Sequence, residues 1–191
     1  MKRNIFSRLN YNKYTSGSGV GSVSSSNRAA LKRRASKSCC TNNINNNIVA
    51  RPRYIKVFFP QPTDGIIQIS QLAVYSNGVN IAPNGTASAA NTFGFGSSIN
   101  KPIDGILSAR GFPDIYHSYE PSDFGYWLLD LSEQFVVDQI VYYNRSDSNN
   151  NRAIGMLIHT YDINYDNNFP NNSVPLNQFI LNSDLIQTFN L

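Results

Sequence analysis

The chain has 191 residues, which is enough for one ordinary domain and a tail. Hydrophobic residues make up 41% and charged residues 15%, and the 26 asparagines favour short strands joined by turns over a helical bundle. This composition, with apolar runs of only a few residues, excludes a collagen, a coiled coil and a membrane-spanning helix.

Charge divides the chain near residue 52. Residues 1–53 contain eleven lysines and arginines and no acidic residue, whereas residues 54–191 contain the other five basic residues and all twelve acidic ones. The sequence therefore predicts a long basic N-terminal arm attached to an acidic body. Such an arm would be attracted to a negative surface, either nucleic acid, anionic lipid or an acidic protein.

The arm, residues 1–52, has the composition of a segment without a core of its own. A Gly/Ser linker occupies residues 15–26, a short basic helix is predicted near 27–37, and residues 42–47 are almost all asparagine. None of these stretches can bury apolar surface. We expect the arm to be extended and to become ordered only when neighbouring subunits bind it.

Cys39 and Cys40 are the only cysteines, and both lie in the arm. An adjacent pair cannot staple a domain, so the first interpretation is two reduced thiols in a protein made in a cytosol-like compartment. A disulfide to a partner chain and a strained vicinal bridge are the alternatives. No apolar stretch of signal-peptide length follows Lys2 and Arg3, so no secretory signal is expected.

The body reads as a series of short strands. Polar and turn-forming residues separate them, and Asn77-Gly78 is a strong hairpin signal. In chain order the strands are predicted over residues 53–59, 66–75 (one strand or two short ones), 125–131, 135–143, 154–161, 178–181 and 185–189. The strands 125–131 and 135–143 are the clearest, and a short polar turn joins them.

This pattern predicts an all-β domain over residues 53–191, built as an antiparallel two-sheet sandwich or jelly roll. Alternation along the strands also identifies a set of apolar residues that should be mostly buried. These are Trp127, Leu129, Leu131, Phe135, Val137, Ile140, Tyr142 and Ile158.

Features of a catalytic centre are sparse in this chain. It has two histidines, no Gly-x-Ser-x-Gly, no HExxH, and no metal-binding CxxC. Asp64-Gly65 and Asp104-Gly105 are first interpreted as turns. We therefore expect a protein that is not an enzyme and that uses neither a cofactor nor a metal.

Most of the body's basic side chains gather in the segments between strands. They are Arg110, His117, Arg145 and Arg152, and Asp147 lies between the last two. A carboxylate that orients a guanidinium creates a rigid fork of donors, which suits sugar hydroxyls, a carboxylate or a phosphate. The alternative is an Arg–Asp–Arg network that only fixes a loop.

The spacing of these residues resembles the sugar-binding signature of the F-type lectins, or fucolectins. The signature appears here as His117, then 27 residues, Arg145-x-Asp147, four residues and Arg152. The landmarks Asn84–Ala89, Ile103–Gly105, Tyr126–Leu131 and Ile140–Arg145 occur in the order typical of the discoidin-like (factor 5/8 C-type) domain, a galactose-binding-like jelly roll. The resemblance implies that His117, Arg145 and Arg152 donate hydrogen bonds to a fucose-like sugar, and that Asp147 orients the arginines.

The chain departs from the family pattern in three respects. The family's adjacent cysteine pair, which packs on the sugar, is replaced by Ser148 and Asn149, and the His-to-Arg spacing is one residue longer. The family's calcium loop is altered at Lys101 and Ile106, and Asp104 alone does not make a calcium site. Three aromatic residues could replace the cysteine platform by stacking on the sugar: Phe112, Tyr116 and Tyr119.

The whole chain is also similar in style to proteins of large double-stranded DNA viruses, which combine Asn-rich sequences and a basic arm with a discoidin-like domain. That resemblance implies a non-enzymatic minor capsid protein of the virion, made in the host cytoplasm. Its partners would be the major capsid protein and other minor proteins. The alternative is a lectin that recognises fucose-like glycans. Nucleic-acid binding is less favoured, because the arm's aromatic residues lie outside its basic cluster.

Overall fold

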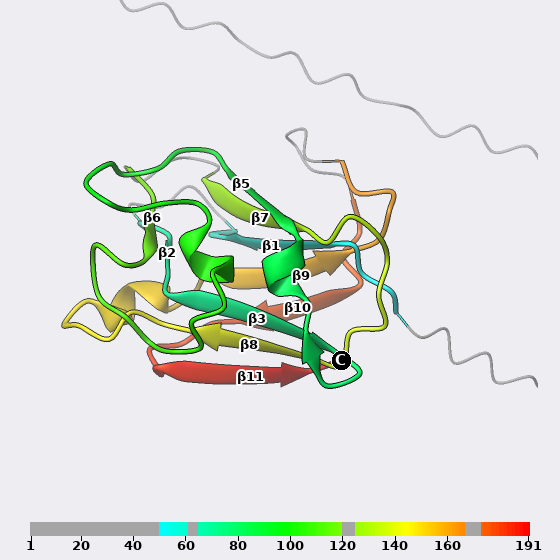
Figure 1. Cartoon of the computed structure of the whole chain (residues 1–191). Helices are drawn as coiled ribbons and strands as arrows, with labels where there is room; N and C mark the ends of the chain where they lie inside the picture. Colours follow the sequence, from blue (N-terminus) through cyan, green and yellow to red (C-terminus); the bar gives the residue numbers. More distant parts are fainter. Residues whose placement is uncertain (1–49, 61–64, 120–124, 167–172) are drawn as a thin grey trace, which may run out of the picture. The chain divides into compact units, whose positions relative to one another are not determined.

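The computed structural model describes residues 50–60, 65–119, 125–166 and 173–191 (Figure 1). These residues form an all-β domain with antiparallel strands, and the only helical elements among them are three short 3₁₀ turns. The predicted helix near 27–37 and the Cys39–Cys40 pair lie outside the described residues, as does the arm apart from residues 50–52.

Five strands form the larger sheet, in the order β10-β9-β1-β7-β5. Every neighbouring pair in it is antiparallel. Its strands are β1 (Tyr54–Phe58), β5 (Thr86–Ala89), β7 (Tyr126–Asp130), β9 (Leu157–Tyr161) and β10 (Asn177–Ile180). Strand β1 is central, and its Ile55 faces Leu129 of β7 on one side and Thr160 of β9 on the other.

Four strands form the second sheet, in the order β11-β8-β3-β4, and a two-stranded sheet pairs β2 with β6. The bounds are β2 (Gln68–Ile69), β3 (Gln71–Ser76), β4 (Val79–Asn80), β6 (Tyr116–His117), β8 (Gln139–Tyr143) and β11 (Ile186–Asn190). The 3₁₀ turns are η1 (Ala82–Asn84), η2 (Lys101–Ile103) and η3 (Asn150–Ala153).

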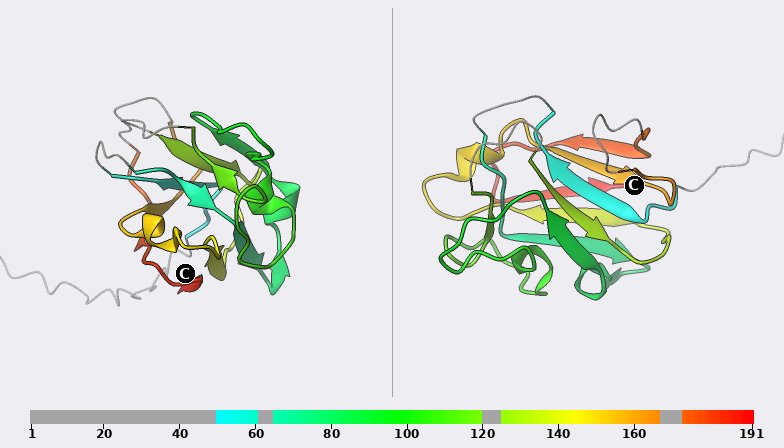
Figure 2. Two further views of the ribbon diagram at one scale, coloured as in Figure 1. Left: turned by 90° about the vertical axis from the view of Figure 1, so that its left-hand side faces the viewer. Right: turned by 90° about the horizontal axis from the view of Figure 1, so that it is seen from above.

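The core lies between the two larger sheets. Ile55, Trp127 and Ile158 of the five-stranded sheet pack in one cluster with Leu72 and Ile140 of the four-stranded sheet. The two layers can be followed in Figure 1 and from two further directions in Figure 2. This arrangement is consistent with a β-sandwich. Seven of the eight predicted core residues are buried, and Phe135 packs against the cluster as a partly buried residue.

The predicted strands are confirmed, with two corrections to their bounds. The strand predicted over residues 135–143 begins only at Gln139, because the Phe135 N–H donates to the carbonyl of Pro52 instead of joining the ladder. The strand predicted over residues 154–161 begins at Leu157 and is preceded by Gly155 at φ +84°. The Asn77-Gly78 hairpin is present, and both residues have the positive φ that a type I′ turn requires.

Candidate functional site

The predicted site residues lie on segments that leave the sheets at one end of the domain. His117 is in β6, Arg145 and Asp147 follow β8, and Arg152 is in η3. In Figure 1, β6 and the yellow turn that contains Arg152 lie at the same end, the left-hand one. The pairing of β6 with β2, in which His117 faces Gln68, fixes the backbone of His117.

The His117 imidazole is half-buried, and its Nδ1 lies 2.6 Å from the carbonyl oxygen of Ser118. A carbonyl can only accept, so Nδ1 carries the proton and Nε2 of the neutral ring is an acceptor. Burial lowers the pKa of His117, and the charges of Arg145 and Arg152 act in the same direction. The ring is therefore neutral at pH 7, and in this tautomer Nε2 is placed to accept a hydrogen bond from a ligand, whereas the sequence analysis expected His117 to donate one.

Arg145 and Asp147 form a bidentate ion pair. Nε of Arg145 donates to Oδ1 of Asp147 and Nη2 donates to Oδ2. The Arg145 side chain is only 5% exposed, whereas that of Asp147 is 37% exposed. The hydrogen bond from Arg145 lowers the pKa of Asp147. The prediction that Asp147 orients an arginine is confirmed for Arg145, whose Nη1 has no partner among the described residues.

Arg152 differs from Arg145 in being exposed and unpaired. Its side chain makes no hydrogen bond or ion pair within the described part of the chain. Its charge nevertheless acts on the His117 ring, as do those of Arg145 and Asp147. We call His117, Arg145, Asp147 and Arg152 the His117 cluster, because the charges of the other three act on the His117 ring; Arg152 is its unpaired cation.

A group of aromatic rings, exposed except for the half-buried Phe93, borders this cluster on the His117 side. Phe93 lies 5.1 Å from the His117 ring and 5.8 Å from Phe112, measured between ring centroids. It also stacks on Tyr119 at 5.9 Å and contacts Phe95 at 5.7 Å. We call Phe93, Phe95, Phe112 and Tyr119 the aromatic shelf.

The aromatic shelf corrects one part of the sequence analysis and extends another. Phe112 and Tyr119 are exposed beside the cluster as expected, but Tyr116 is fully buried and donates its hydroxyl to the carbonyl of Asn91. The sequence analysis did not predict Phe93 and Phe95 as part of the site. In the structure Phe95 is 84% exposed and has a φ of +58°. Two phenylalanines alternating with glycine in a polar loop were the signal for them.

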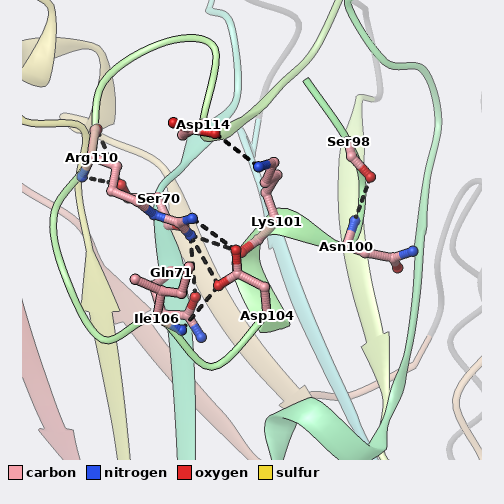
Figure 3. A network of polar contacts seen from close by, with 9 residues as sticks. All are labelled: Ser70, Gln71, Ser98, Asn100, Lys101, Asp104, Ile106, Arg110 and Asp114. Carbon is pink, nitrogen blue, oxygen red and sulfur yellow. Dashed lines mark hydrogen bonds and ion pairs between the residues drawn. The ribbon is translucent and has the colours of Figure 1, made fainter. Parts of the chain in front are cut away.

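Arg110, the fourth basic residue of the predicted group, makes its side-chain contacts in a separate network with Asp104, Ser70, Gln71 and Lys101 (Figure 3). Its guanidinium donates to both carboxylate oxygens of Asp104, to the Ser70 and Lys101 carbonyls, and to Oε1 of Gln71. Its Nε is enclosed without a partner. The network ties the start of β3 to η2 and to the turn at Asp104.

The backbone next to Arg110 connects this network to the site. The carbonyl of Arg110 accepts from the Ser146 N–H, and the main chain at Phe112 contributes, after Arg145, to lowering the pKa of Asp147. A Cβ added at Gly111 would lie 3.3 Å from the Asp147 carboxylate, so the two loops are in close contact. Arg110 thereby helps to set the position of both Asp147 and the aromatic shelf.

The described residues offer neither a metal site nor a membrane-spanning helix. No group of three or more His, Cys, Asp or Glu side chains in the described part of the chain is arranged to hold a metal ion. No helix among the described residues is long and apolar enough to cross a membrane.

Comparisons of the chain with family models, with curated proteins and with solved structures give no match.

Proposed function

We propose that the body of this protein is a carbohydrate-binding module with a discoidin-like jelly-roll fold. One observation carries the proposal: a neutral imidazole, an oriented guanidinium and an unpaired arginine lie beside an exposed aromatic shelf. Sugars present hydroxyls at their edges and C–H groups on one face, so they bind where polar groups and an aromatic ring meet. The five-plus-four antiparallel strand order supports the jelly-roll assignment.

Each residue of the site has a distinct role in this proposal. Arg152, and Nη1 of Arg145, donate hydrogen bonds to sugar oxygens, while Nε2 of His117 accepts from a hydroxyl. Asp147 holds Arg145 and does not touch the sugar. The aromatic shelf packs on the apolar face of the sugar in place of the family's cysteine pair. By resemblance to the F-type lectins, the ligand is a fucose-like glycan.

Replacing Arg152 by alanine should weaken glycan binding by about 10–100-fold, which corresponds to the loss of one charge-assisted hydrogen bond. Because Arg152 is exposed and unpaired, its removal should leave the melting temperature unchanged. Titration of the full chain with a fucose-terminated oligosaccharide, followed by calorimetry, measures the first effect. Thermal unfolding measures the second.

Arg51→Ala is the matched control for this prediction, because it removes an exposed arginine that precedes β1. It should change neither property. Arg145→Ala should also weaken binding, but it should lower the melting temperature as well, since it breaks a largely buried ion pair. If the wild-type chain binds no glycan on an array, the cluster only fixes the loops and the proposal is wrong.

A second candidate function is a structural role in a virion, as a minor capsid component. The observation that favours it is the concentration of eleven basic and no acidic residues in the first 53, next to an acidic body. An arm of this kind is suited to contacts with acidic surfaces of neighbouring subunits. The two functions are compatible, because the sugar site uses only residues of the body.

The position of the arm in an assembled particle tests this second candidate. In a density map we expect residues 28–40 to lie against neighbouring capsid proteins. Density that follows the packaged genome would favour nucleic-acid binding instead. Absence of the protein from purified particles would contradict the structural role.

A further inference from the structure

The outer face of the five-stranded sheet, on the side away from the core, contains an unusual lysine. In β1, Ile55 and Val57 are fully buried in the core, so Lys56 between them points to the opposite face. Its Nζ lies 5.1 Å from the centroid of the Phe58 ring and 5.3 Å from that of Tyr126. A third ring, Tyr165, lies 5.8 Å away.

Lys56 is largely buried, and its ammonium, which keeps some contact with solvent, has no counter-ion among the described residues. The residue is only 9% exposed, and its ammonium has no hydrogen bond or ion pair with any described residue. Burial is the cause that lowers the pKa of Lys56, and no carboxylate acts against it. Removing an unpaired ammonium from water costs several kcal/mol, and cation–π contacts with exposed or partly buried rings return only about 0.5–2 kcal/mol.

The carboxylate available on this face is already used. Asp130 of β7 lies opposite Tyr54 in the β1–β7 ladder. Tyr54 is two residues before Lys56 in β1, so Asp130 and Lys56 lie on the same face of the sheet. Both oxygens of Asp130 accept from Arg53, Oδ1 at 2.8 Å from Nε and Oδ2 at 2.9 Å from Nη2. Lys56 is thus left as a cation whose complement is missing from the described part of the chain.

His159 adds a second unsatisfied nitrogen at the same place. It lies directly opposite Lys56 in the β1–β9 ladder. Its Nδ1 is 3.0 Å from the Tyr161 hydroxyl, while its Nε2 is enclosed without a partner. Burial, and secondarily the charge of Lys56, lowers the pKa of His159 to about 4, so that this ring is neutral at pH 7 and Lys56 is the cation of the pair.

We infer that this face binds a small monocarboxylate at Lys56, with the apolar body of the ligand against the surrounding rings. A carboxylate supplies one negative charge, which matches one ammonium, and charge-assisted hydrogen bonds are the strong ones. A doubly charged phosphate or sulfate would bring an excess of charge into an aromatic environment, where desolvation is costly. The site is separate from the His117 cluster and does not depend on the proposed sugar binding.

Benzoate is a suitable probe, since it combines one carboxylate with one aromatic ring. The full chain, labelled with ¹³C at lysine, would be titrated with sodium benzoate at constant ionic strength. We expect a saturable shift of the Lys56 Cε–Hε signal together with the His159 ring signals. Benzyl alcohol, which has the same ring and no charge, should cause no saturable shift, and neither should chloride.

Two variants locate the effect. Lys56→Met keeps most of the side-chain volume and should weaken benzoate binding by about tenfold or more, the equivalent of one charge-assisted contact. Lys101→Met is the matched control, because Lys101 already pairs with Asp114, and it should bind benzoate as the wild type does.

Three results would overturn the inference. They are a Lys56 signal that does not shift, a shift that benzyl alcohol reproduces, and a shift confined to the signals of His117 and its neighbours. The wild-type titration decides among these even if Lys56→Met does not fold.

Discussion

Replacing Leu129 by alanine should lower the free energy of unfolding by about 2–5 kcal/mol, the range for a truncated core leucine. Leu129 is fully buried in β7, between β1 and β5, and faces Ile55 and Ala87 across the two ladders. The backbone also closes tightly around it, since a Cβ on Gly85 would lie 2.5 Å from its Cδ1. With strands fixed on both sides, the cavity cannot collapse easily.

Denaturant unfolding of the full chain measures this loss, with Ile180→Ala as the matched control. Ile180 lies in the edge strand β10 and is 71% exposed, so its truncation should change the free energy of unfolding by no more than about 0.5 kcal/mol. A Leu129→Ala loss below about 0.5 kcal/mol would mean that β7 presents the opposite face to the core, as a register shift of one residue would cause.

Replacing Arg110 by alanine should lower the free energy of unfolding by about 2–4 kcal/mol. The Arg110 side chain is 13% exposed and that of Asp104 is 26% exposed, so this ion pair is largely, though not fully, withdrawn from water. Removing the guanidinium takes a donor from the Asp104 carboxylate and from the Ser70 and Lys101 carbonyls, although the Ile106 and Asp104 N–H groups still donate to Asp104 Oδ1 and to the Lys101 carbonyl. Breaking a buried pair by removing one partner costs about 3–5 kcal/mol, and the exposure of Asp104 reduces that value.

Two further variants distinguish the stability that the Arg110 network contributes from that of an ordinary exposed ion pair. Lys101→Ala removes the exposed ion pair with Asp114 and should cost at most about 1 kcal/mol. Arg110→Lys should not restore stability, because an ammonium cannot reach oxygens on both sides as a planar guanidinium does. A loss in Arg110→Ala that equals the loss in Lys101→Ala would contradict the structural role given to Arg110.

The sequence contained most of the strand pattern, because period-two alternation records which face of a strand is buried. The sequence did not indicate to which of the two sheets each strand belongs. The clear strands β7 and β8 follow each other after a short polar segment, yet β7 joins the five-stranded sheet and β8 the four-stranded one. Which strand lies beside which depends on long-range pairing, such as β1 with β7, that no local signal specifies.

The candidate site was predictable to the extent that its residues follow a fixed spacing. His117, Arg145, Asp147 and Arg152 do form one cluster, but their spacing could not say that Arg145 is buried and Arg152 exposed. The placement of His117 Nε2 as an acceptor depends on the Ser118 carbonyl beside Nδ1. The direction of that carbonyl is set by the backbone conformation, which the sequence did not predict. The partner of Arg110 likewise depends on how the turn at Asp104 folds back over β3.

The Arg110 network has a consequence for the conditions in which the protein keeps its shape. A bound metal ion can hold several oxygens together, but it dissociates when its free concentration falls or when a chelator competes for it. The positive charge that gathers the oxygens of Asp104, Ser70 and Lys101 is covalently part of the chain. The loops that carry Phe112 and Asp147 are therefore held by a cation that neither dilution nor a chelator can remove, in media poor or rich in divalent ions alike.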